Sequence, residues 1–154
     1  MPDVRGGLTG PLRLPAALAE ELLAHAQACL PNEACGLLSA ARGSGVATRF
    51  HATRNVDASP LRFTVHPEDL VRIVFEIERE GRQLLAIFHS HVRSAAVPSA
   101  ADRRAAAAYP DACHVLASMT DASAGPHAAL RAWRIHDGEA TPVALEIMSG
   151  TLAP

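Results

Sequence analysis

The sequence has 154 residues, which fits one domain of ordinary size, with 49% apolar and 19% charged residues. Its net charge of −2, with 14 scattered basic residues, gives no clustered basic surface, so we expect no nucleic-acid partner. No stretch approaches the roughly 18–20 apolar residues of a membrane span, so we expect no membrane partner. Three cysteines without a C-x-x-C pair, and an N-terminus without a signal-peptide pattern, predict a cytoplasmic protein.

In the first half of the chain, the sequence pattern predicts a strand, then a helix, then the two strands of a hairpin. Residues 1–10 contain three glycines and no hydrophobic pattern, so we expect a flexible N-terminus before a domain over residues 11–150. Apolar residues at helical spacing predict a helix from residue 15 to about 29, and Pro31 ends it. The other predicted elements are strands at 12–14, 35–40 and about 46–52, and an extended segment at 63–65.

The second half alternates between helices and strands. A helix is predicted from about residue 67 to 80, where Gly81 ends it, and a short one over 99–108. An apolar run over 84–90 that ends in polar residues is typical of a central strand arriving at a site. Further strands are predicted at 114–118, about 129–136 and 141–148, with Trp133 in the core. This order predicts a single-domain α/β/α layered fold around one mixed sheet.

One group of polar residues indicates a metal site. His89 and His91 are two positions apart on a predicted strand, so both imidazoles project from the same face. Asp102 follows near a helix start, and two imidazoles with one carboxylate suit catalytic zinc, which keeps a fourth position for water. Each residue also has an ordinary explanation. An H-x-H pair is often surface chemistry, Asp102 fits a helix N-terminus, and Glu33 could be an exposed acid in a turn.

The order and spacing of these residues resemble a known signature. His89-Ser90-His91, seven residues, Ser99, two residues and Asp102 match the H-S/T-H-x7-S-x2-D motif of the JAMM (MPN+) zinc metalloproteases at every fixed position. Residues 32–38 resemble that family's segment around its catalytic glutamate, here Glu33. The similarity extends over residues 12–148. The chain resembles the small prokaryotic members that hydrolyse amino acids from the C-terminus of ubiquitin-like sulfur-carrier proteins.

The resemblance implies a fold like that of cytidine deaminases and a role for each site residue. His89, His91 and Asp102 would hold Zn²⁺, and Glu33 would take a proton from the zinc water and pass it to the leaving amine. Ser99 would donate a hydrogen bond to the oxyanion, a role that we expect to compete with helix capping for the one hydroxyl. By strand alternation, Ser90 would face away from the metal as support. Cys35 is expected to be a small buried residue, and the remaining histidines to have ordinary surface or core roles.

The implied function is zinc-dependent hydrolysis of the amide or isopeptide bond at the C-terminus of a ubiquitin-like sulfur-carrier protein, with release of cysteine or another amino acid. A processing protease that trims a carrier after Gly-Gly is a related hypothesis. The sequence leaves open the carrier, the amino acid, a homodimer, and any control of the metal by Cys35. The predicted short loops leave no room for the insertions with which family members grip ubiquitin chains.

Three hypotheses from other classes compete with this one. A binding module of the MPN type would keep the fold and dock a partner without catalysis. A non-haem iron oxygenase also uses two histidines and a carboxylate, but it gives Glu33 no role. A nucleoside deaminase would need an H-x-E motif together with a P-C-x-x-C motif, and this sequence lacks that combination because it has no P-C-x-x-C.

Overall fold

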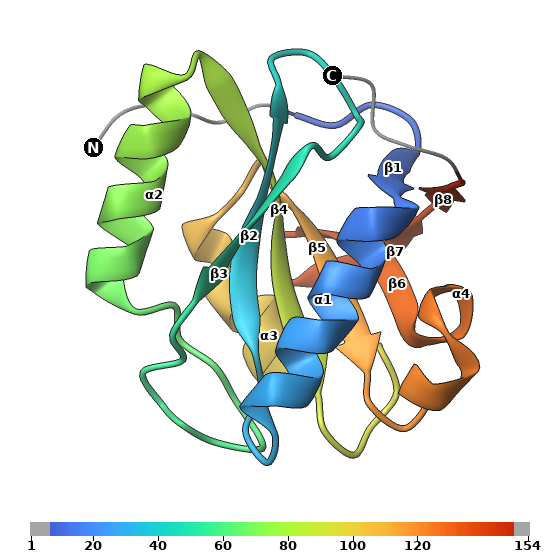
Figure 1. Cartoon of the computed structure of the whole chain (residues 1–154). Helices are drawn as coiled ribbons and strands as arrows, with labels where there is room; N and C mark the ends of the chain where they lie inside the picture. The colour runs from blue at the N-terminus through green and yellow to red at the C-terminus, as the bar shows by residue number, and fades with distance from the viewer. Residues whose placement is uncertain (1–6, 150–154) are drawn as a thin grey trace.

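The computed structural model describes residues 7–149, and a six-stranded mixed sheet forms its centre (Figure 1). The strand order is β3-β2-β4-β5-β6-β7; β4 and β5 run parallel, and the other neighbours are antiparallel. The bounds of these strands are β2 (Cys35–Ala41), β3 (Arg49–Thr53), β4 (Arg82–His91), β5 (Cys113–Ser118), β6 (Leu130–His136) and β7 (Glu139–Val143).

Two long helices cover the opposite faces of this sheet. Helix α1 (Ala16–Cys29) packs through Leu18 and Leu22 into the cluster that contains Leu38 of β2. Helix α2 (Pro67–Arg79) packs through Ile73 and Ile77 into a second cluster that contains Leu37. Because consecutive strand residues point to opposite faces, these two leucines separate two apolar layers. Each fully buried Leu or Ile contributes roughly 1.5–3 kcal/mol. The predicted α/β/α layering and mixed sheet are therefore confirmed.

The prediction of one sheet and of one strand over 141–148 is wrong. The chain changes partner at Ala144: β7 pairs with β6, whereas β8 (Leu145–Met148) pairs in parallel with β1 (Leu12–Pro15) in a separate two-stranded sheet. The amide of Leu12 donates to the carbonyl of Ala144 (2.9 Å), at the point where the chain passes from one sheet to the other. The hydrophobic pattern of residues 141–148 continues through Ala144, so the pattern does not indicate that the chain changes its pairing partner there.

The predicted second hairpin strand over 46–52 begins later than expected. Val46 forms only an isolated bridge with Arg13, and the amide of Ala47 donates to the Arg13 carbonyl (2.9 Å). Residues 46–47 therefore pair with β1, and β3 pairs with β2 only from Arg49. The short helix α4 (Pro126–Ala129) and the 3₁₀ turn η2 (Ala122–Ala124) had no predicted counterpart.

The remaining predicted elements are confirmed to within a few residues. The expected helix over 99–108 consists of α3 (Ala100–Ala105) and the 3₁₀ turn η1 (Ala106–Ala108). Of the N-terminal segment predicted to be flexible, residues 1–6 lie outside the described part of the chain, and Leu8 is buried. Between residues 7 and 149, no helix is long and apolar enough to cross a membrane.

Strand β2 begins beside the end of β4, and this contact positions the site. Cys35 pairs with His89, and Gly36 pairs with Phe88. A Cβ at Gly36 would lie 2.3 Å from the Phe50 ring and 2.7 Å from the His51 carbonyl, so only glycine lets β3 and its aromatic ring approach this closely. The segment that carries Glu33 therefore enters the sheet directly against the His89 end of β4.

A buried histidine on β3 predicts a loss of stability in acid. His51 is 6% exposed, and its Nε2 lies 2.8 Å from Ser39 Oγ. Burial, helped by the charge of Arg49, lowers the pKa of His51 to about 4. Between pH 4 and about 6.5 the unfolded chain thus binds a proton that the folded chain does not. His51 therefore lowers the unfolding free energy as the pH falls from about 6.5 towards 4, by at most about 1.4 kcal/mol per pH unit. Above about pH 6.5 its side chain is neutral in both states, and this loss is absent.

We predict that His51→Gln flattens the dependence of the unfolding free energy on pH between 4.5 and 6.5. Urea denaturation at several pH values measures this slope. His136→Gln is the control, because the His136 side chain is 78% exposed and should add little to the slope. Equal slopes for wild type and His51→Gln would show that His51 is protonated in the folded state. His114, whose pKa burial also lowers to about 4, accounts for part of the slope that remains.

Candidate metal centre

The three predicted ligands converge on one point at the end of β4. His89 Nε2 lies 3.2 Å from His91 Nε2, and each of these nitrogens lies 3.1 Å from Asp102 Oδ2. A tetrahedral site with bonds of about 2.0–2.1 Å has ligand atoms about 3.3–3.4 Å apart. The triangle formed by these three atoms is therefore close to one face of such a tetrahedron.

Asp102 is held by the helix cap as well as facing the imidazoles. It is the third residue of α3, where its amide donates to Ser99 Oγ (3.0 Å) and its Oδ2 accepts from the Ser99 amide (2.9 Å). Burial raises the pKa of Asp102, but the contacts of its carboxylate with the imidazoles of His89 and His91 outweigh this and hold the pKa well below its usual range. The carboxylate is thus ionised and fixed, as a ligand requires.

Glu33 is buried at 4% exposure, so the alternative of an exposed acid in a turn is wrong. Its amide donates to the Ser59 carbonyl (2.9 Å), and its carbonyl accepts from Asn55 Nδ2 (3.1 Å). The next amide, of Ala34, donates to Ser90 Oγ (2.8 Å), and the Ser90 amide donates back to the Ala34 carbonyl (3.0 Å). Ser90 therefore faces away from the imidazoles and supports the Glu33 segment, as expected.

Two carboxylates could complete the ligand set, and their surroundings differ. Glu33, His89 and His91 offer ligand atoms within 4.8 Å of one another. Asp102 already contacts both imidazoles directly, whereas Glu33 Oε1 is buried with no hydrogen-bond partner among the described residues. Burial raises the pKa of Glu33 to about 7, with His91 opposing and Asp102 adding to the shift. A fixed carboxylate with a free oxygen and a pKa near neutrality suits a general base better than a ligand.

The two imidazoles have unequal surroundings, which sequence reasoning missed. His91 Nδ1 lies 2.8 Å from the Ala95 carbonyl; since a carbonyl only accepts, Nδ1 carries the hydrogen and Nε2 keeps its lone pair for a metal. The His89 ring stacks on Phe63, with centroids 4.3 Å apart, and its Nδ1 is buried without a partner in the described residues. Neither a main-chain acceptor nor a stacking ring produces a sequence motif, so neither contact could be predicted from the sequence.

An apolar cavity of about 300 Å³ lies against the metal centre. His89 and Asp102 form part of its wall, and Phe63, Ile87 and Tyr109 contribute apolar surface. Cys35 is fully buried nearby on β2, with its Sγ 3.2 Å from Thr53 Oγ1. Burial raises the pKa of Cys35 to about 11, which keeps the thiol protonated, in agreement with the expected structural role.

Comparison with known proteins gives a consistent family. The family described as prokaryotic homologs of the JAB domain matches residues 15–136. A CysO-cysteine peptidase from Mycobacterium bovis is 33% identical over 139 residues, 90% of this chain and 92% of that protein. A desampylase from Haloferax volcanii is 35% identical over 62% of this chain and 72% of its own length. A probable TtuB-protein conjugate cleaving protease from Thermus thermophilus is 38% identical over 64% and 68%.

Solved structures share the fold. A protein from Desulfitobacterium hafniense, 29% identical, superposes with a TM-score of 0.78 over 90% of this chain and 93% of its own. A structure described as JAMM, a metalloprotease-like zinc site in the proteasome and signalosome, has a TM-score of 0.54 over 88% of this chain and 97% of its own. At 13% identity, the second likeness concerns the fold alone.

The two carboxylates can be separated by their effect on metal binding. We predict that Asp102→Ala weakens zinc binding more than about 100-fold, the upper end of what losing an outer partner of a ligand costs. Glu33→Gln should leave the zinc affinity within about tenfold of wild type. Competition with a chromophoric chelator measures both dissociation constants. The reverse order of effects would make Glu33 the ligand and Asp102 only a helix cap.

Proposed function

This chain belongs to the family of prokaryotic homologs of the JAB domain, and from that membership we propose that it is a Zn²⁺-dependent hydrolase of ubiquitin-like sulfur-carrier conjugates. The bond cleaved is the amide or isopeptide bond at the carrier's C-terminus, and the product is cysteine or another amino acid. One observation carries the proposal: the buried Glu33 carboxylate, with an oxygen that lacks a partner, lies beside His89 and His91.

The residues present fit a zinc ion. Two imidazole nitrogens and one carboxylate oxygen form a borderline-soft donor set, 3.1–3.2 Å apart, which suits zinc better than calcium or magnesium. When bound at this point, Zn²⁺ polarises a carbonyl and lowers the pKa of a water towards about 7. The unpartnered Oε1 of Glu33 has an acceptor free for that water.

Glu33 moves the proton in this proposal. Its carboxylate takes a proton from the water as the water oxygen bonds to the scissile carbonyl carbon. The protonated Glu33 then gives the proton to the amine nitrogen as the carbon–nitrogen bond breaks. The raised pKa of about 7 suits a group that must both accept and release a proton near neutral pH.

Ser99 stabilises the negative charge that develops on the carbonyl oxygen. Its Oγ accepts from the Asp102 amide in the helix cap, which occupies a lone pair of the hydroxyl and leaves the O–H free to donate. The expected competition between capping and oxyanion binding therefore does not arise. The cap instead holds the hydroxyl beside the carboxylate that we propose as a ligand.

The substrate class is supported by the relatives, which are named a CysO-cysteine peptidase and a probable TtuB-protein conjugate cleaving protease. We extend this to a sulfur-carrier substrate for this chain, in the cytoplasm. The cavity of about 300 Å³ beside His89 has room for part of such a substrate. A non-catalytic binding module would need neither the buried Glu33 carboxylate nor the convergence of His89, His91 and Asp102, so both features favour an enzyme.

We predict that the purified protein releases the amino acid from a carrier–cysteine conjugate, which mass spectrometry detects as loss of the C-terminal residue. The assay is run after chelation and again after zinc is restored, and activity should return only with zinc. A carrier extended beyond Gly-Gly tests the trimming alternative in parallel. Turnover of neither substrate in the presence of zinc would refute the proposed hydrolase.

We predict that Glu33→Gln lowers kcat by about 10²–10⁴-fold, because the amide cannot take the proton. Circular dichroism and zinc binding should match the wild type. Glu68→Gln is the matched control, since the Glu68 side chain is 86% exposed and should leave turnover unchanged. If Glu33→Gln kept wild-type turnover, another group would have to be the base.

We predict that Ser99→Ala lowers kcat by about 10²–10³-fold and the unfolding free energy by about 1 kcal/mol, since the cap and the oxyanion donor are both lost. Ser99→Thr keeps a hydroxyl and should recover most of both. Steady-state kinetics and urea denaturation on the same samples separate the two effects. A stability loss without a kcat loss would leave Ser99 with capping alone.

A further inference from the structure

The loop at residues 92–98 joins the two halves of the metal centre and is held through its main chain. It leaves β4 after His91, passes the end of β5, reaches β6 and returns to Ser99. Three successive carbonyls accept hydrogen bonds from three side chains. The Ser94 carbonyl accepts from Ser118 Oγ (2.8 Å), that of Ala95 from His91 Nδ1 (2.8 Å), and that of Ala96 from Trp133 Nε1 (2.9 Å).

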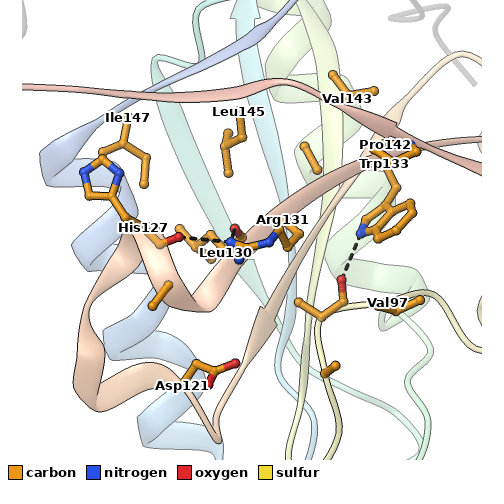
Figure 2. A pocket seen from close by; sticks show the side chains of 14 residues that line it. Val97, Asp121, His127, Leu130, Arg131, Trp133, Pro142, Val143, Leu145 and Ile147 are labelled. Atoms are coloured by element: carbon orange, nitrogen blue, oxygen red, sulfur yellow. Dashed lines mark hydrogen bonds between the residues drawn. The ribbon is translucent and has the colours of Figure 1, made fainter.

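Within this loop only Ala96 and Pro98 are buried. Ala95 and Ala96 carry only methyl groups, and the Val97 side chain is 52% exposed. Behind the loop lies a pocket of about 450 Å³, which Ala95, Ala96 and Val97 line together with Trp133 (Figure 2). Because a cavity lies behind the loop, its conformation depends on these three hydrogen bonds together with that from the Val97 amide to the Ala95 carbonyl (2.8 Å).

Trp133 is the most distant of the three donors. It lies on β6, opposite His114 of β5, so it is two strands away from the ligand His91. Its ring is only half-buried, so the prediction of a plain core residue missed its polar contact. Figure 2 shows its indole nitrogen directed at the loop carbonyl.

We propose that Trp133 is a positioning residue for the metal centre. Its N–H holds the Ala96 carbonyl, which keeps the adjacent Ala95 carbonyl in place against His91 Nδ1. That acceptor fixes the orientation of the His91 ring and places a hydrogen on Nδ1, which leaves Nε2 to bind a metal at the point where His89 and Asp102 converge. Trp133 lies two strands from His91 and acts through two peptide carbonyls. The inference rests on the ligand set proposed above.

The sequence offers a clean test, because Trp133 is the only tryptophan. Supplying the benzothiophene analogue to a tryptophan auxotroph replaces this one N–H by sulfur and leaves the ring shape almost unchanged. We expect the zinc dissociation constant, measured by chelator competition on the full chain, to rise about tenfold. In the metal-free protein, at a pH at which His91 is neutral, ¹⁵N NMR should show a smaller population of the Nδ1–H tautomer of His91.

Two variants complete the test. Trp133→Phe should shift zinc affinity and tautomer in the same direction, and Ser118→Ala, which removes the donor to Ser94, should do so independently. Val143→Ala is the matched control: it enlarges the same pocket without touching the loop, so it should change unfolding free energy but neither other readout.

The outcomes separate this inference from the proposed function. Unchanged zinc affinity and an unchanged His91 tautomer in the folded analogue protein would overturn the positioning role, even if stability fell. Failure of the wild type to bind zinc would count against the proposed hydrolase. The tautomer of the metal-free protein would then still decide whether Trp133 acts on His91.

Discussion

The reciprocal hydrogen bonds between Ala34 and Ser90 are the contact on which the site depends. They join residues 56 positions apart in the sequence, at 2.8 Å from the Ala34 amide to Ser90 Oγ and 3.0 Å from the Ser90 amide to the Ala34 carbonyl. Ser90 is fully buried, and an unpaired buried amide costs about 1–3 kcal/mol, so the two chains have little freedom to slide. Glu33 precedes one partner, and both histidines flank the other.

Burial of several ionisable groups at this point is unfavourable, and neighbouring side chains determine which of them stay charged. Several groups that could carry charge are removed from water, and each would be unfavourable alone. The imidazoles of His89 and His91 hold Asp102 ionised, while desolvation holds Glu33 near the neutral form. Two carboxylates in one site thus have pKa values shifted in opposite directions by their surroundings, that of Asp102 downwards and that of Glu33 upwards.

Elements with strong periodicity could be predicted, and elements defined by their partners could not. The apolar face of α2 and the continuous apolar run of β4 lie in the sequence itself. The separation of β7 from β8 depends on β1, more than a hundred residues earlier. The site follows the same rule. The spacing of His89, His91 and Asp102 is a signature, so these residues could be named in advance. Phe63, Ala95 and Trp133 act through stacking or a carbonyl contact, which only the folded chain reveals.

The alternation of side chains between the two faces of β4 connects the metal centre to the core. His89 and His91 share one face with Ile87, which belongs to the apolar cluster under α2, whereas Phe88 belongs to the cluster under α1. A slip of one residue would move every side chain to the other face and bury both imidazoles against α1. On β2, Leu37 and Leu38 oppose the same slip, and a register irregularity after Leu38 separates this pairing from the rest of the strand. The register that buries two apolar layers is therefore also the register that brings Glu33 to the two histidines.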